Sequence, residues 1–263
     1  MEFAVLPEIA FFDAIAEVAA AETLPRFRMS VSVDNKHAGG FDPVTEADRE
    51  AERAIRRLIS EQYPEHGILG EEHGDVGLDR DHVWVIDPID GTRAFISGLP
   101  VWGTLVGLYH NGRAVMGMMD QPFTGERFIG SPEGAFVRRN GQTTPLQTRK
   151  GVSLEQAIMM TTSPSIFPKD LEPAYKRVEN NVQLARYGCD CYAYAMVAAG
   201  HVDMVVEAGL KAYDVGGLIP LVEQAGGVMT TWSGARPEQG GSIVASGSPA
   251  LHEAALEMLN RTE

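Results

Sequence analysis

Acidic side chains are concentrated in residues 65–90, which contain eight acids and one base, Arg80. Two clusters stand out: Gly70-Glu71-Glu72, and the segment 87–92, which contains Asp87 and Asp90 and follows a short apolar run. Two carboxylates three residues apart across a proline-containing turn can converge on one point, where they repel each other unless one is protonated or a cation lies between them. Hard divalent cations such as Mg²⁺ take oxygen ligands, which carboxylates and a backbone carbonyl supply.

The residues that follow Asp90 suit an anion. Gly91 and Thr92 open a predicted helix, and free amides at the start of a helix bind anions. Cation ligands followed at once by an anion pocket favour metal-assisted chemistry on a phosphate. The acids also follow residues 83–86, a predicted buried strand, and α/β proteins place their sites at the carboxyl ends of strands.

Each acidic residue that could take part in such a site, within residues 65–90 or elsewhere in the chain, also has a purely structural explanation. An Asp-Gly pair usually forms a turn, and adjacent acids such as Glu71 and Glu72 commonly lie on a solvated face. Asp48 fits the first turn of a capping box, and Asp214 could cap the helix that follows it. The segment 87–92 is more specific, because its acids lie between a buried strand and a small, polar turn.

The first half of the chain predicts two helices and an antiparallel sheet. Apolar residues recur at helical spacing in residues 7–24 and 45–62, and the glycine-containing stretch 30–43 predicts a loop or irregular hairpin. A run of β-type segments follows, separated by turn signals such as Asn111-Gly112. We expect these segments to form an antiparallel meander of residues 101–109, 113–119, 126–130 and 134–137.

The second half alternates strand and helix patterns, which is typical of an α/β region. The predicted strands are residues 157–161, 202–206, 228–231 and 243–245. The predicted helices are residues 189–200, 214–225 and 249–259. We therefore expect an α+β protein with an alternating α/β second half, built as one continuous unit of two halves, residues 1–145 and 146–263.

Composition and charge exclude several classes of protein. The chain has 263 residues, 44% of them apolar and 22% charged, which excludes a disordered chain and a small disulfide scaffold. Its net charge is −14, so we expect no nucleic-acid or anionic-membrane partner. No apolar stretch approaches the roughly 20 residues that span a bilayer. Cys189 and Cys191 are spaced for neither a disulfide nor a zinc site, and we expect a soluble, cytoplasmic protein with reduced thiols.

Several segments of the chain resemble signature segments of the inositol monophosphatase family, in the family's order. They are VTEAD (44–48), GEE (70–72), WVIDPIDGT (84–92), AYDVGG (212–217) and EQAGG (223–227). Together they extend over most of the chain, from about residue 36 to 250. One departure is Tyr213, because many members have Trp before the aspartate; both are large aromatic residues, so we expect the metal site to be retained.

This resemblance implies a layered αβαβα sandwich with the site between its halves, and Mg²⁺-dependent hydrolysis of a small phosphate monoester with two or three ions per site. It implies metal ligands at Glu71, Asp87, Ile89 (through its carbonyl), Asp90 and Asp214. Asp48 is implied to help hold a more weakly bound metal and, with Thr92, to orient the attacking water, so the implied catalytic residues are Glu71, Asp48 and Thr92. The amides of Gly91 and Thr92 are implied to hold phosphate oxygens. The first half would then carry most metal ligands, and the second half the substrate contacts and Asp214.

Within the family, the chain is most similar to the histidinol-phosphate phosphatases. The similarity lies in residues 92–105 and 188–194. Asp190 falls where inositol-specific members tend to have a small uncharged residue, and Glu207 falls where the family contacts the leaving alcohol. We expect these two acids, with Arg186, to contact the substrate, and histidinol phosphate to fit them because it carries an amine and an imidazole. The structural alternative is that Asp190 caps the helix that starts there.

Other functions remain as alternatives to histidinol phosphate hydrolysis. The chain could act on inositol 1-phosphate or another small monoester, or it could bind metal and phosphate without turnover. A glycosidase that uses a pair of acids is disfavoured, because five acids gather where such an enzyme needs two. On family analogy we also expect a homodimer.

Overall fold

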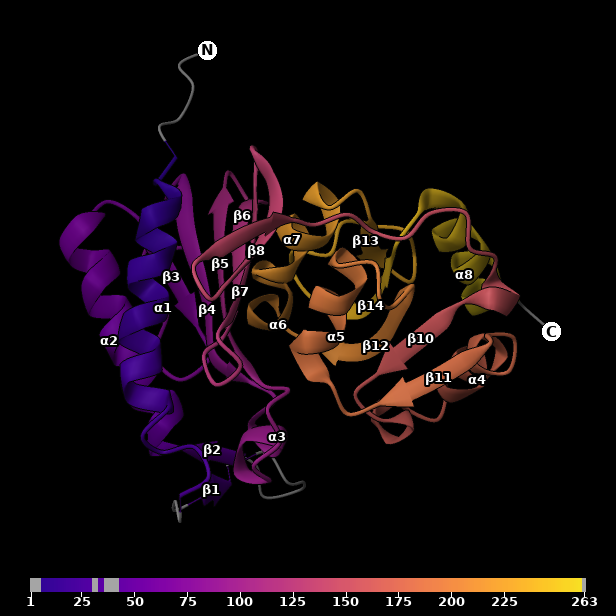
Figure 1. Ribbon diagram of the computed structural model, residues 1–263, viewed down its shortest axis with the longest axis horizontal. Helices are drawn as coiled ribbons and strands as arrows, with labels where there is room; N and C mark the ends of the chain where they lie inside the picture. The colour runs from indigo at the N-terminus through magenta and orange to yellow at the C-terminus, as the bar shows by residue number, and fades with distance from the viewer. Residues whose placement is uncertain (1–5, 30–32, 36–42, 262–263) are drawn as a thin grey trace.

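The helices and sheets of the chain stack in five layers (Figure 1). The computed structural model of the protein describes residues 6–29, 33–35 and 43–261. Two helices cover the outer face of a seven-stranded sheet, three helices lie between that sheet and a five-stranded sheet, and two further helices cover the second sheet. This arrangement is the αβαβα sandwich that the sequence predicts.

The first sheet begins with a parallel pair of strands and continues as an antiparallel meander. Its order is β3 (Gly67–Gly70), β4 (His82–Asp90), β5 (Gly103–His110), β6 (Arg113–Gln121), β7 (Glu126–Ser131), β8 (Gly134–Arg139) and β9 (Gln142–Pro145). Helices α1 (Ile9–Thr23) and α2 (Glu46–Gln62) pack on its outer face. The predicted meander is therefore confirmed.

Two strands of the first sheet were not predicted. β3 has four residues with glycine at both ends, and every residue of β9 is exposed, so neither shows an apolar pattern. Between α1 and α2, strands β1 (Val33–Asn35) and β2 (Pro43–Thr45) pair antiparallel, as an irregular hairpin would. The rest of the predicted loop 30–43 lies outside the described residues.

The second sheet mixes parallel and antiparallel neighbours. Its order is β11 (Leu184–Tyr187), β10 (Ile158–Thr161), β12 (Met204–Leu210), β14 (Gly241–Ser246) and β13 (Val228–Thr231). Its outer face is covered by α4 (Glu172–Glu179) and α8 (Pro249–Asn260). The 3₁₀ turns η1 (Leu154–Gln156) and η2 (Pro164–Ile166) flank β10. The edge strand β11 and the short helix α4 were not predicted.

The central layer contains α5 (Asp190–Ala198), α6 (Ala212–Gly216) and α7 (Leu218–Gln224). The predicted single helix 214–225 is therefore wrong, because the chain forms two helices that meet at Gly217. The predicted strand 202–206 is shifted, since β12 runs four residues further towards the carboxyl end. The short helix α3 (Thr92–Ile96) follows β4, at the position where the sequence predicts a helix start.

A row of glycines on the first sheet lies against the backbone where α6 and α7 meet. Gly107, Gly117 and Gly130 lie side by side on β5, β6 and β7. A Cβ added to Gly117 would lie 2.2 Å from the carbonyl oxygen of Gly217, and one added to Gly107 would lie 2.4 Å from that of Gly216. The backbone of α6 and α7 thus lies directly on the sheet, with no side chain between them.

We predict that Gly117→Ala destabilises the protein by about 2 kcal/mol or more, because the new methyl group meets backbone that cannot rotate away. Gly74→Ala is the matched control, since a Cβ there has nothing within 4 Å and the backbone is not left-handed; its effect should stay within about 0.5 kcal/mol. Urea unfolding measures both. Equal stability of the two variants would contradict the close contact.

Candidate metal and phosphate site

Three carboxylates from two elements meet at one point. Asp87 and Asp90 lie at the end of β4, and Asp214 lies in α6. One carboxylate oxygen from each lies within 4.8 Å of the others. Residues three apart on a regular strand point to opposite faces, but the pairing of β4 with β5 shifts register between Asp87 and Asp90. This irregularity brings both side chains to the same side.

The electrostatics of this cluster favour a bound cation. Burial raises the pKa of Asp87 well above its usual value, and the charges of Glu71, Asp90 and Asp214 raise it further. Burial also raises the pKa of Asp90 well above its usual value, and the charges of Asp190 and Asp214 raise it further. Without a cation, these groups gain protons to relieve the repulsion. An all-oxygen set of this spacing fits a hard divalent ion, so the residues suit the metal that the sequence implies.

Each of the three clustered aspartates is oriented by a hydrogen bond from a backbone amide. The amide of Ile89 donates to Asp87 Oδ1 at 3.1 Å, and that of Cys191 to Asp90 Oδ2 at 2.6 Å. The amide of Lys211 donates to Asp214 Oδ2 at 2.6 Å. Asp214 is the third residue of α6, so the expectation that it could be an N-cap is wrong; Lys211 is the N-cap.

Asp48 serves as a cap and also faces the site. Its Oδ2 accepts from the backbone amide of Thr45 at 2.9 Å and from the Thr45 hydroxyl at 2.6 Å, which completes the predicted capping box. Its Oδ1 faces the Thr92 hydroxyl at 3.5 Å, and that hydroxyl also lies 3.2 Å from the Ile89 carbonyl. Burial raises the pKa of Asp48 to about 6, and the charge of Glu71 contributes. The two explanations of Asp48 are therefore compatible.

A cavity of about 180 Å³ contains this cluster. Its lining residues are Glu71, Asp87, Ile89, Asp90, Gly91, Thr92, Arg93, Thr162, Asp190 and Asp214. Arg93 and Thr162 were not predicted, because neither belongs to an acidic or glycine-rich pattern. Gly91 has a φ of 83°, and a Cβ there would lie 3.1 Å from Asp190 Oδ2, so this position suits glycine on both counts.

Asp190 and Glu207 meet at one threonine beside the cluster. The Thr162 hydroxyl donates to Asp190 Oδ1 at 3.1 Å, and the Thr162 amide donates to Glu207 Oε1 at 2.6 Å. Glu207 is 2% exposed, and burial raises its pKa to about 8. Cys189 is the N-cap of α5, so the capping alternative for Asp190 is wrong; Asp190 itself has a φ of 41°. Such strain is commonly found at functional sites.

Arg186 does not reach this cavity wall. It lies exposed on β11 and is not among the lining residues. Its guanidinium lies near Cys189, where it slightly offsets the rise in the pKa of that thiol that burial causes.

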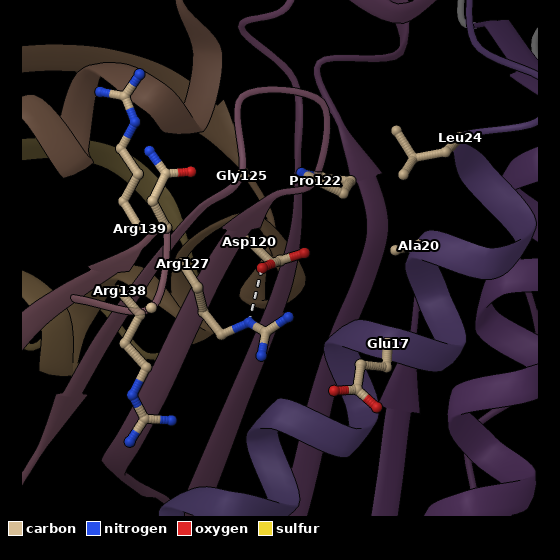
Figure 2. A pocket seen from close by; sticks show the side chains of 11 residues that line it. Glu17, Ala20, Leu24, Asp120, Pro122, Gly125, Arg127, Arg138 and Arg139 are labelled. Atoms are coloured by element: carbon tan, nitrogen blue, oxygen red, sulfur yellow. Dashed lines mark hydrogen bonds and ion pairs between the residues drawn. The ribbon is translucent and has the colours of Figure 1, made fainter. Parts of the chain in front are cut away.

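A larger cavity, of about 390 Å³, lies between α1 and strands β6–β8. Figure 2 shows Asp120 and Arg127 on one wall and Glu17, Ala20 and Leu24 of α1 on the other. The Arg127 guanidinium in this cavity is already paired within the protein, because it donates to Asp120 at 2.8 Å and to Asp13 at 2.7 Å. These pairs stabilise the packing of α1, and this cavity has none of the converging carboxylates of the smaller one.

Comparison with known proteins identifies the family of the chain. A profile of the inositol monophosphatase family matches residues 7–262. The chain belongs to this family. It is 41% identical over 258 residues to the bifunctional phosphatase IMPL2 of Arabidopsis thaliana, covering 94% of this chain and 73% of that protein. It is 32% identical over 247 residues to a histidinol-phosphatase of Chlorobaculum parvum, covering 93% of both chains.

Solved structures give the same family. An inositol monophosphatase from Zymomonas mobilis superposes with a TM-score of 0.85 and is 38% identical, covering 96% of this chain and 97% of that one. The family assignment makes the chain a phosphatase of this family. Within the described residues, no helix is both long enough and apolar enough to cross a membrane.

We predict that Asp90→Asn makes the metal-free protein more stable, and more so as the pH rises. An acid whose pKa is raised by folding stabilises the folded state at low pH and loses that contribution as the pH rises through its folded pKa. Wild type in chelator should therefore lose stability as the pH rises above the ordinary pKa of an aspartate, about 4, and the variant should lose less. Thermal melts at several pH values measure this, with added Mg²⁺ reversing the loss in wild type only. Parallel pH profiles for the two proteins would contradict it.

Proposed function

We propose that the protein is a Mg²⁺-dependent histidinol-phosphatase, which hydrolyses L-histidinol phosphate to L-histidinol and phosphate in histidine biosynthesis. The observation that carries the proposal is the pair of acids that Thr162 binds beside the carboxylate cluster, the partly buried Asp190 and the buried Glu207. The histidinol-phosphatase of Chlorobaculum parvum supports it, since this chain matches nearly its whole length. The resemblance further supports a cytoplasmic homodimer.

Different residues of the site would have different roles in hydrolysis. Bound Mg²⁺, two or three ions in this proposal, would supply positive charge to the phosphate and to the leaving oxygen and would acidify a water molecule. The ligands would be Glu71, Asp87, Asp90, Asp214 and the carbonyl of Ile89. Asp48, with its second oxygen facing the Thr92 hydroxyl, would accept a hydrogen bond from the attacking water. The amides of Gly91 and Thr92 would hold phosphate oxygens at the start of α3.

The carboxyl groups of Asp190 and Glu207 favour a leaving group that carries positive charge. Asp190 and Glu207 bring two carboxyl groups to one place, and burial raises the pKa of both. A neutral polyol gains little from two acids, whereas the amine and imidazole of histidinol phosphate can pair with both. A nearby cation favours the ionised form of Glu207, so binding would lower its pKa from about 8.

The second candidate is hydrolysis of inositol 1-phosphate. It is favoured by the structural similarity to the inositol monophosphatase of Zymomonas mobilis. A third candidate is a protein that binds metal and phosphate without turnover. It would keep the same carboxylate cluster, so only measured activity separates it from the first two.

A substrate panel tests the proposal. We expect phosphate release from histidinol phosphate with Mg²⁺, and its loss in excess chelator. The panel includes inositol 1-phosphate, a sugar bisphosphate and adenosine bisphosphate at the same Mg²⁺ concentration. Release that persists in chelator would overturn the metal mechanism, and no release from any ester would favour the binding protein.

Asp190→Asn should weaken selection for the cationic ester. A charge-assisted hydrogen bond contributes roughly 1.5–3 kcal/mol, so kcat/KM for histidinol phosphate should fall about ten- to a hundredfold. The kcat/KM for inositol 1-phosphate should change much less, which makes that ester the internal control. The idea fails if wild type prefers the inositol ester, or if the substitution lowers both values equally.

A further inference from the structure

The turn that carries Glu71 is held from two sides. On one side, the amide of Glu71 donates to the carbonyl of Ile86 on β4 at 3.2 Å. On the other side lies α2, which presents Glu52 and Arg56, one helical turn apart, to residues 70–74. Neither residue lines the cavity or belongs to a motif that the sequence analysis singled out.

The Glu52 carboxylate is completely buried and binds the turn directly. Its Oε2 accepts from the amide of Glu72 at 2.7 Å, and its Oε1 accepts from the amide of His73 at 3.2 Å. Arg56 Nε donates to the same Oε1 at 2.6 Å. A buried carboxylate thus takes up the two amides that follow Glu71 in the chain.

Arg56 binds the carbonyls of the same turn. Its Nη2 donates to the His73 carbonyl at 3.0 Å, and its Nη1 donates to the Gly74 carbonyl at 2.9 Å. Gly70 leaves room for the pair, because a Cβ there would lie 2.2 Å from Glu52 Oε1 and 2.6 Å from Arg56 Nη2. The clamp, defined as Glu52 and Arg56, therefore satisfies both the donors and the acceptors of the turn.

Helix α2 joins this clamp to the site. Asp48 and Glu52 are four residues apart and are both buried on one face of the helix. Asp48 feels the charge of the Glu71 carboxylate, whereas Glu52 binds the backbone just after Glu71. Glu71 and Asp87 line the same cavity. A shift of the turn would therefore move the Glu71 carboxylate relative to the cluster.

We propose that Glu52 and Arg56 are positioning residues, which fix the backbone that follows Glu71, hold its carboxylate beside the cluster and so set the affinity for Mg²⁺. The inference rests on the proposed metal-dependent function. Groups that orient metal ligands typically change metal affinity by about 10- to 100-fold when they are replaced. We expect the clamp to affect metal affinity in this way, with a smaller effect on the rate once metal is saturating.

Glu52→Gln tests the clamp, because glutamine keeps the size of the side chain but lacks the charge and presents one acceptor oxygen. We expect the Mg²⁺ dissociation constant, measured by calorimetry on the whole chain without substrate, to rise at least about tenfold. The Mg²⁺ concentration for half-maximal activity should rise in parallel, and kcat at saturating Mg²⁺ should change less. Arg56→Lys, which retains the charge but lacks the forked contact with two carbonyls, should shift Mg²⁺ affinity in the same direction.

Asp203→Asn is the matched control. Asp203 is also completely buried and accepts from Arg149 Nε and from the amide of Ile158, both at 2.7 Å. It directly precedes β12 of the second sheet and does not line the cavity of the cluster. It should lower thermal stability without changing Mg²⁺ affinity. If Glu52→Gln and Asp203→Asn bind Mg²⁺ as wild type does, the positioning role is overturned. If wild type binds no Mg²⁺ at all, the proposed function fails instead.

Discussion

Repulsion between buried carboxylates is the constraint on which the rest of this structure depends. The acids of the cluster raise one another's pKa values, so a free chain would move them apart or protonate them. The protein opposes this with backbone amides, which fix one oxygen of each acid and leave the other oriented by the fold. The pairs of acid and donor are Asp48 with Thr45, Asp87 with Ile89, Asp90 with Cys191 and Asp214 with Lys211. Glu71 differs, because the backbone around it is what is held.

These amides come from elements far apart in the sequence. Asp90 of the first sheet is bound by the start of α5, which belongs to the second half of the chain. Thr162, which follows β10, binds both Asp190 of α5 and Glu207 of β12, and Thr162 and Asp190 line the same cavity as the cluster. The site therefore forms only when both sheets and the central helices are assembled, so folding itself brings its acids together.

Much of this site could be predicted from the sequence, because its acids lie in short segments with a distinctive order. The meander and the α/β second half were also predictable from turn signals and alternation, whereas the layered sandwich was implied by the family resemblance. Other features could not be, since they depend on tertiary contact: Arg93 and Thr162 show no pattern, and Glu52 reads as one more acid on an amphipathic helix. Asp48 shows a different difficulty. In the sequence, capping and catalysis look like alternatives for this residue, yet a carboxylate has two oxygens, so one can cap the helix while the other faces the site.

The row of glycines beneath α6 fixes the distance between this helix and the first sheet. Where two backbones touch without side chains, their separation is set by the van der Waals radii of peptide groups, and no rotamer change can adjust it. Asp214 stands at one end of this contact and Asp87 lies on the neighbouring strand β4. The distance between these two acids is thus built into the main chain. Substitutions elsewhere can reshape the part of the cavity around Thr162 and Asp190 while leaving the distance between Asp87 and Asp214 unchanged.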